Sequence, residues 1–175
     1  TLRSISSQTY RNFEVIISDN LSGDDTLQIV KEWQKHQDFP VHIFSNNNIG
    51  IGNNWNFFFF FSNGKCFKFI FQDDVMRNDC LQVMTEFFIA HKNIKFVACK
   101  RNFINSNANL TGAENWISKY GNLQSQFMHP DETYHIVTRK IFKNDYFFMS
   151  PTNKIGEPSA VMFDRNIIKK VGMFN

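Results

Sequence analysis

The stretch from Lys68 to Val75 constrains the fold of this chain more than any other. It reads Lys-Phe-Ile-Phe-Gln-Asp-Asp-Val, so a short apolar run leads directly into two adjacent carboxylates. Such a run is typical of a buried strand in a parallel sheet. Because open α/β sheets bind ligands at the carboxyl ends of their strands, we expect Asp73 and Asp74 at a ligand-binding edge.

Two interpretations of Asp73 and Asp74 stay open on spacing alone. Mg²⁺ and Mn²⁺ prefer oxygen ligands, often one or two carboxylates completed by substrate phosphates. Either carboxylate could instead cap the helix that is expected to follow. Two carboxylates supply too few ligands for a closed metal site, so we expect phosphate oxygens of a substrate to complete the coordination of the cation.

The pattern of elements predicts an α/β fold, with a mostly parallel sheet flanked by helices. Strands alternate with helices through about residue 100, as in consecutive βαβ units. The expected strands are 13–18, 41–44, 65–71, 96–99 and 159–163. The expected helices are 22–36, 53–62, 79–91, 131–142 and 164–172, and 102–125 receives no assignment. Five phenylalanines, 57–61, wrap round the second helix, which predicts a helix buried between layers.

The 175 residues suffice for one domain with a core, and 42% are hydrophobic. The net charge of +3 fits a phosphorylated substrate or an anionic membrane surface and requires neither. The densest basic pair is Lys169–Lys170, so no cluster predicts a nucleic-acid patch. The three cysteines lack metal or redox spacing, which favours reduced thiols in a cytoplasmic protein.

Five short motifs, taken in order, resemble the family 2 glycosyltransferases of the GT-A fold. The first combines Ser6–Asn20 with the spaced set Asp19, Asn20, Ser22, Asp25 and Thr26. The others are Asn48-Ile49-Gly50 followed by Asn56, then Gln72–Asp74, Gly156–Phe163 and Val171–Phe174. The resemblance covers most of the chain and is weakest at 102–150. One departure is Trp55, which stands where the family commonly has a basic residue.

The resemblance implies a transferase that uses a nucleotide-sugar donor, most simply a UDP-sugar. Its donor-binding positions fall on Asp19, Asn20, Ser22, Asn48, Gly50, Asn56 and Asp73. Asp19 matches the acid that contacts the base, and a carboxylate can accept a hydrogen bond from a nucleobase N–H or a ribose hydroxyl. It could instead bond its own turn. Asp73 and Asp74 match the positions for Mg²⁺ or Mn²⁺ and ribose, with their division of labour open.

The resemblance also divides the chain into a nucleotide-sugar half, 1–100, and an acceptor half, 101–175, of one GT-A domain. It implies inverting transfer to a polysaccharide, lipid-linked or other glycan acceptor. Glu157 is the matched acid on the acceptor side, able to orient an acceptor hydroxyl or to cap a turn. We expect both ends to be cut, with the usual catalytic base beyond Asn175, so this stretch alone should transfer little sugar.

Two alternatives belong to other functional classes. The first is a non-catalytic nucleotide-binding domain of the same fold, because a fold alone does not fix a function. The second is a flavodoxin-like signalling domain with Mg²⁺ at Asp73 and Asp74, although no convincing phosphoacceptor set accompanies them. For the transferase we expect a bacterial cytoplasmic protein, with peripheral association at the inner face of the plasma membrane as one possibility.

Overall fold

The computed structural model divides the chain into two compact units. The first comprises Thr1–Val97 and Met162–Asn175, and the second comprises Ala98–Val161. The structure describes residues 1–47, 49–102, 104, 114, 117–118, 121, 128–129, 131–150 and 153–174. The division expected at residue 100 lies close to the first boundary, but the last segment of the chain groups with the first unit.

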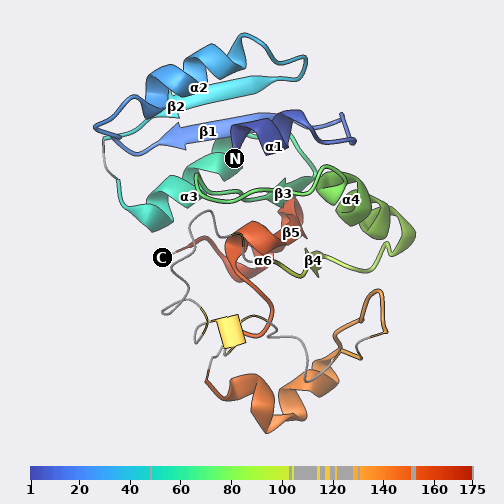
Figure 1. The fold of residues 1–175 in the computed structure, drawn as a ribbon. Coiled ribbons are helices and arrows are strands. Elements are labelled where there is room, and N and C mark those ends of the chain that lie inside the picture. The colour runs from blue at the N-terminus through green and yellow to red at the C-terminus, as the bar shows by residue number, and fades with distance from the viewer. Residues whose placement is uncertain are drawn as a thin grey trace. The chain divides into compact units, whose positions relative to one another are not determined.

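The first unit is built on a βαβ element. Strands β1 (Val15–Asp19) and β2 (Val41–Ser45) are parallel, with Val15 opposite Val41 and Asp19 opposite Ser45. Helix α2 (Thr26–Gln34) connects them and runs alongside the strands (Figure 1). Asp24 Oδ1 accepts a hydrogen bond from the Thr26 N–H at 3.0 Å just before the helix, whereas the N-cap residue Asp25 makes no side-chain capping bond. The predicted α/β class is therefore confirmed.

A second sheet has the strand order β3-β5-β4, formed by Cys66–Lys68, Val161–Asp164 and Phe96–Ala98. Strands β3 and β5 are antiparallel, so this sheet departs from the parallel arrangement expected around the central strand. That strand is also shorter than the predicted 65–71. Its last register pair is Lys68 with Met162, and the chain then turns where the Asp74 N–H donates to the Phe71 carbonyl at 3.2 Å.

Helix α3 (Ile51–Phe61) carries the phenylalanine run and packs against strands of both sheets. Phe57 lies 5.0 Å from Phe44 of β2, and Phe59 lies 4.8 Å from Phe67 of β3, measured between ring centroids. The expectation that this helix is buried on every side is wrong, because Phe60 is 66% exposed. Strands of the two sheets cover two sides of the helix, and Phe60 lies on a side that the described residues leave exposed.

The other α-helices of the first unit are α1 (Leu2–Ser6), α4 (Cys80–Ala90) and α6 (Ile168–Val171), of which α4 is as long as α3. The 3₁₀ turn η4 (Arg165–Ile167) directly precedes α6. Asp164 caps η4 by accepting from the Asn166 N–H at 2.8 Å, at the position where a helix was expected to begin. Within the described ranges, no helix combines the length and apolar character that crossing a bilayer requires.

The described part of the second unit contains three 3₁₀ helices, η1 (Arg139–Lys143), η2 (Asp145–Phe148) and η3 (Pro158–Ala160). The predicted helix at 131–142 is wrong, because helical structure starts only at Arg139. Every residue from 131 to 140 is exposed, so no buried face stabilises a longer helix. The Thr138 hydroxyl accepts from the Lys140 N–H and marks the actual start.

Candidate functional site

Asp19, the last residue of β1, presents an unsatisfied carboxylate oxygen. The residue is only 7% exposed. Its Oδ2 accepts from the Ser22 N–H at 3.2 Å and lies 3.5 Å from the Ser45 hydroxyl. Its Oδ1 is buried and has no hydrogen-bond partner among the described residues. Since a buried carboxylate oxygen without a donor is costly, Asp19 is prepared to accept a hydrogen bond from a ligand.

Leu21 turns the chain sharply just after Asp19. Its φ of +68° lies in the left-handed region, which costs a residue with a side chain about 1–2 kcal/mol. This conformation accompanies the return of the Ser22 N–H to Asp19 Oδ2. The turn thus occupies one oxygen of Asp19 and leaves the other available, at the expense of local strain.

The loop before α3 lies against this turn. Asn20 Oδ1 accepts a hydrogen bond from the Ile49 N–H at 3.0 Å. Gly50 has φ +80°, a backbone conformation that glycine adopts readily. Asn48, predicted to contact the donor, lies outside the described residues. Asp19, Asn20, Ser22 and the Gly50 loop therefore meet at the carboxyl edge of the parallel sheet.

Asn56 lies in the second turn of α3 and is only 8% exposed. Its Nδ2 donates to the Phe174 carbonyl at 2.8 Å, and its Oδ1 accepts from the Phe174 N–H at 2.9 Å. These two bonds hold the C-terminal segment against α3. Both polar atoms of the Asn56 side chain therefore have a partner in the absence of a ligand. The predicted contact between Asn56 and the donor stays a prediction.

Asp73 and Asp74 lie in the turn that follows β3. Asp73 is exposed and Asp74 is partly buried. Within the described part of the chain, neither carboxylate makes a hydrogen bond or ion pair, and no three acidic, His or Cys side chains group as a metal site. Two free carboxylates fit a hard cation whose remaining ligands come from elsewhere.

Two consecutive residues of α3 contact the surroundings of both acidic positions. Asn54 Oδ1 accepts from the hydroxyl of Ser18, the residue before Asp19. The Trp55 ring stacks on Phe71, just before the acidic turn, with centroids 5.5 Å apart. In Figure 1 the loop with Asp73 and Asp74 extends toward the same side of the first unit as the carboxyl ends of β1 and β2.

Glu157 belongs to the second unit, where its carboxylate pairs with the Arg101 guanidinium. This partner was not predicted, because Arg101 belongs to no motif. The ion pair gives the Glu157 carboxylate a fixed direction.

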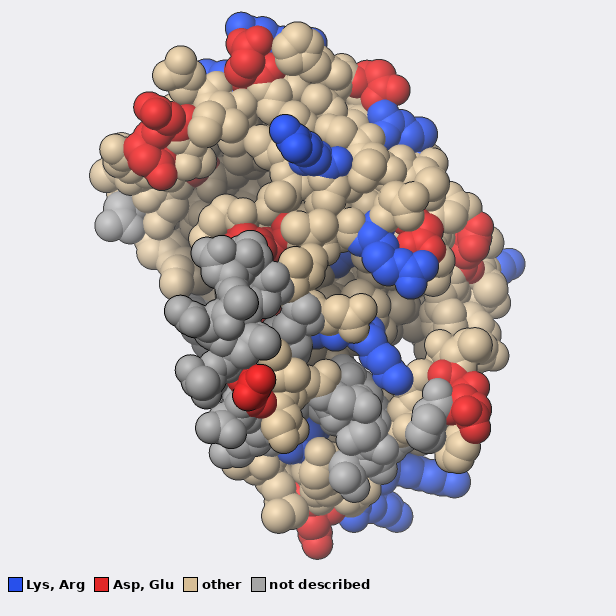
Figure 2. Space-filling view, viewed as in Figure 1, with Lys and Arg blue, Asp and Glu red and all other residues tan. Residues whose placement is uncertain are grey.

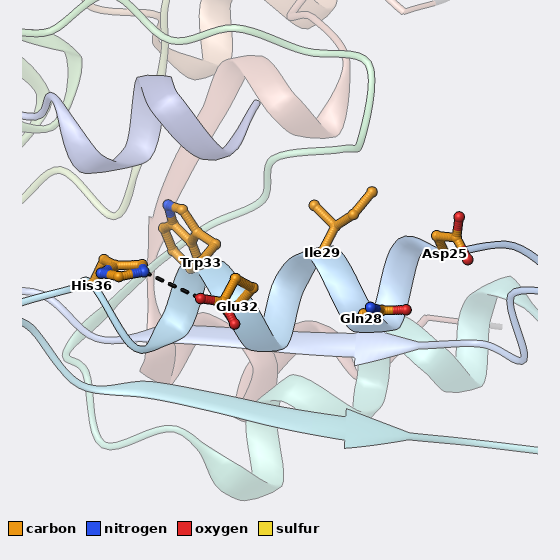
Figure 3. Close-up of a pocket in the computed structure, with 6 residues that line it drawn as sticks. All are labelled: Asp25, Gln28, Ile29, Glu32, Trp33 and His36. Atoms are coloured by element: carbon orange, nitrogen blue, oxygen red, sulfur yellow. Dashed lines mark hydrogen bonds and ion pairs between the residues drawn. The ribbon is translucent and has the colours of Figure 1, made fainter.

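A further concave feature lies on the surface of α2. A shallow groove runs along α2 and is lined by six residues, Asp25, Gln28, Ile29, Glu32, Trp33 and His36 (Figure 3). Of these, only Asp25 belongs to a motif of the sequence, and none is a predicted donor or metal residue. On the face shown in Figure 2, acidic and basic side chains of the described residues are interspersed.

The chain is similar to a known protein family. A model of the family described as "Glycosyl transferase family 2" matches residues 1–172. A search among curated proteins finds no match.

Solved structures similar to this chain include those of S. aureus TarS. A structure of TarS 1–349 matches with a TM-score of 0.67 and 20% identity, over 99% of this chain and 44% of that one. The same TarS fragment with UDP-GlcNAc gives a TM-score of 0.67 and 20% identity, over 99% and 43%. Its complex with UDP gives 0.63 and 20%, over 99% and 44%. The chain spans less than half of these structures, and at this identity the likeness establishes a shared fold.

Proposed function

The chain belongs to glycosyl transferase family 2, and from this premise we propose that it binds a UDP-sugar and takes part in transferring the sugar to a glycan or lipid-linked acceptor. The family match agrees with the resemblance found in the sequence. The TarS structures with UDP and UDP-GlcNAc support a uridine nucleotide as the donor.

The observation that carries this proposal is the buried, unpartnered Oδ1 of Asp19. Uracil presents an N3–H donor, and a carboxylate is acceptor-only when ionised. Cytosine has a lone pair at N3 in place of this donor, so the carboxylate would repel it. We propose that Asp19 Oδ1 accepts the uracil N3–H, and that Asn20, Ser22 and the Gly50 loop line the same donor pocket.

Asp73 and Asp74 would hold Mg²⁺ or Mn²⁺ together with the diphosphate of the donor. Both carboxylates lack partners within the described residues, and carboxylate oxygens suit either cation. When bound, the cation would neutralise the negative charge of the departing nucleoside diphosphate.

Inverting transfer would have the acceptor hydroxyl attack the anomeric carbon from the face opposite the diphosphate. The C–O bond to the diphosphate breaks, UDP leaves, and a carboxylate accepts the proton of the hydroxyl. Glu157, paired with Arg101, would orient the acceptor hydroxyl. Cytoplasmic location and attachment to the inner face of a membrane stay predictions.

Calorimetric titration of the chain with UDP, CDP and ADP tests the proposal. The expected result is binding with a clear preference for UDP over CDP, increased by Mn²⁺. Equal affinity for all three nucleotides, or none for any, would overturn it. Titration with UDP-GlcNAc and other UDP-sugars then asks which sugar the pocket accepts.

A further inference from the structure

We propose that Ser18, Asn46 and Asn54 form a cluster that positions the Asp19 carboxylate without touching the nucleotide. They are called the Ser18 cluster below. None of the three belongs to the set of donor residues indicated by the sequence. The inference rests on the proposed function, because it concerns how the uracil-recognising carboxylate is held in place.

The Ser18 cluster is a closed ring of hydrogen bonds. The Ser18 hydroxyl donates to Asn54 Oδ1. Asn46 Nδ2 donates to Ser18 Oγ at 2.6 Å and to Asn54 Oδ1 at 3.2 Å, which uses both of its N–H groups. Ser18 Oγ, Asn54 Oδ1 and Asn46 Nδ2 are thus all bonded to one another, which makes a partly buried polar network.

The ring is attached to the backbone on both sides of Asp19. Asn54 Nδ2 donates to the Ser18 carbonyl at 3.4 Å, immediately before Asp19. The Asn46 N–H donates to the Asp19 carbonyl at 2.8 Å, immediately after its Cα. The peptide groups on the two sides of the Asp19 Cα are thus held by the Asn54 side chain and by the main chain of Asn46.

The Ser18 cluster acts from the opposite face of the parallel sheet. Successive side chains of a strand point to opposite faces, so Ser18 and Asp19 diverge. Ser18 contacts α3 through Asn54, whereas Asp19 lies beside Ser45, its register partner in β2. A residue of the cluster can therefore alter the aim of Asp19 only through the backbone of β1, which makes it a positioning residue.

The α3 helix extends this arrangement toward the acidic turn. Asn54 holds β1, while the next residue, Trp55, stacks on Phe71 beside Gln72 and Asp73. The Ser18 cluster thus also connects β1, which carries Asp19, to α3, whose Trp55 packs beside the proposed metal-binding turn.

The test compares Asn54→Ala with Asn12→Ala. Asn12 is an exposed asparagine with no hydrogen bond in the described part of the chain, so it controls for loss of an amide. We expect Asn54→Ala to reduce the preference for UDP over CDP by about tenfold, because the Asp19 carboxylate would no longer be aligned with the uracil N3–H. Asn54→Asp keeps the acceptor oxygen for Ser18 and Asn46 but cannot donate to the Ser18 carbonyl, so we expect it to lose the preference as Asn54→Ala does.

If Asn54 only stabilised the fold, its removal would not change the preference for UDP over CDP. If Asn54→Ala weakens UDP and CDP by the same factor, or leaves the preference unchanged, the inference is overturned. Should Asn54→Ala fail to fold, Ser18→Ala removes one hydroxyl from the same ring and is judged by the same ratio.

A measurement without nucleotide separates this inference from the proposed function. Hydrogen exchange reports the amide of Ser22, which is bonded to Asp19 Oδ2. We expect its exchange to be about tenfold faster in Asn54→Ala than in Asn12→Ala, whether or not any nucleotide binds. Unchanged exchange of Ser22 would overturn the positioning role, whereas normal results here with no UDP binding in the native chain would overturn the proposed function alone.

Discussion

Two acidic positions of the first unit differ in how completely the protein has prepared them. Asp19 is buried, with one oxygen bonded to its own turn and its backbone held by Asn46 and Asn54. Asp73 and Asp74 lie in a turn, one exposed and one partly buried, and their carboxylates make no hydrogen bond or ion pair within the described residues. Asp19 is thus a buried acceptor with one bonded oxygen, whereas both oxygens of the other two carboxylates are open to a ligand.

The difference suggests a division of labour in donor recognition. A fixed, desolvated acceptor discriminates between bases, because a partner lacking the donor leaves a buried oxygen unpaired. The carboxylates of Asp73 and Asp74 would contribute mainly charge, and we propose that a cation together with a diphosphate completes their site. We therefore expect base selectivity to depend on Asp19 and the metal requirement to depend on Asp73 and Asp74.

Asp19→Ala is expected to have the largest effect. Removal of a charged acceptor from a buried bond should weaken UDP binding about tenfold to a hundredfold, with Mn²⁺ or with EDTA alike. Calorimetry measures both affinities. Asp38→Asn serves as a control, because that exposed carboxylate pairs with Arg11 away from β1's carboxyl end. An Asp19→Ala variant with unchanged UDP affinity would contradict the account.

Asp73→Asn and Asp74→Asn should affect binding only when metal is present. We expect each to remove most of the increase in UDP affinity that Mn²⁺ provides, by about tenfold in at least one of them, and to leave affinity in EDTA unchanged. The variant with the larger effect identifies the main metal ligand. Equal losses with and without Mn²⁺ would mean that these carboxylates contact the nucleotide directly.

Leu21→Gly sharpens the comparison by relieving strain beside Asp19. Glycine adopts a positive φ without penalty, so the free energy of unfolding should rise by about 1 kcal/mol, measured by urea denaturation. UDP affinity should change by less than about threefold, because the Ser22 backbone N–H remains. A loss of stability would show that the exposed Leu21 side chain matters more than its backbone conformation.

Substitution of Asp164 is expected to have the smallest effect. In contrast to Asp19 and the acidic pair Asp73 and Asp74, the Asp164 carboxylate is bonded to other residues of the protein. The Lys95 ammonium at 2.7 Å, and then the Asn166 N–H, lower the pKa of the Asp164 carboxyl. A lowered folded-state pKa stabilises the protein above the unfolded pKa, and this stabilisation is lost as pH falls through the folded value. Asp164→Asn should therefore cost at most about 1 kcal/mol at pH 7 and nothing well below about pH 4.

The measurement for Asp164 is urea denaturation at a series of pH values. The difference between the native chain and Asp164→Asn is expected to shrink steadily as the pH is lowered through the acid range. A constant difference from pH 7 to pH 2 would show that Asp164 acts through packing and not through its charge.

Local signals predicted much of the first unit. The β-branched run ending at Asp19 predicts β1 within a few residues, and Asp24 marks the start of α2. The aromatic run of α3 predicts a helix, but not that Phe60 remains exposed, because burial depends on which elements pack against each flank. The antiparallel pairing of β3 with β5 joins residues almost a hundred positions apart, which no local pattern reports.

The candidate site was predictable only where a short motif marks it. Asp19 and the acidic pair follow apolar runs, and this placement predicts a sheet edge. The Ser18 cluster has no such mark, since a serine and two asparagines read as ordinary strand-end and helix residues. Its signal exists only in the fold, which brings together side chains 28 and 36 residues apart.

A crystal structure of the chain with UDP and Mn²⁺ would show which side chains contact the base and the diphosphate. We expect the uracil N3 to lie within hydrogen-bonding distance of Asp19 Oδ1 and the diphosphate to face Asp73 and Asp74. A uridine bound elsewhere, such as in the groove along α2, or an Asp19 Oδ1 without any contact to the bound base, would contradict this expectation.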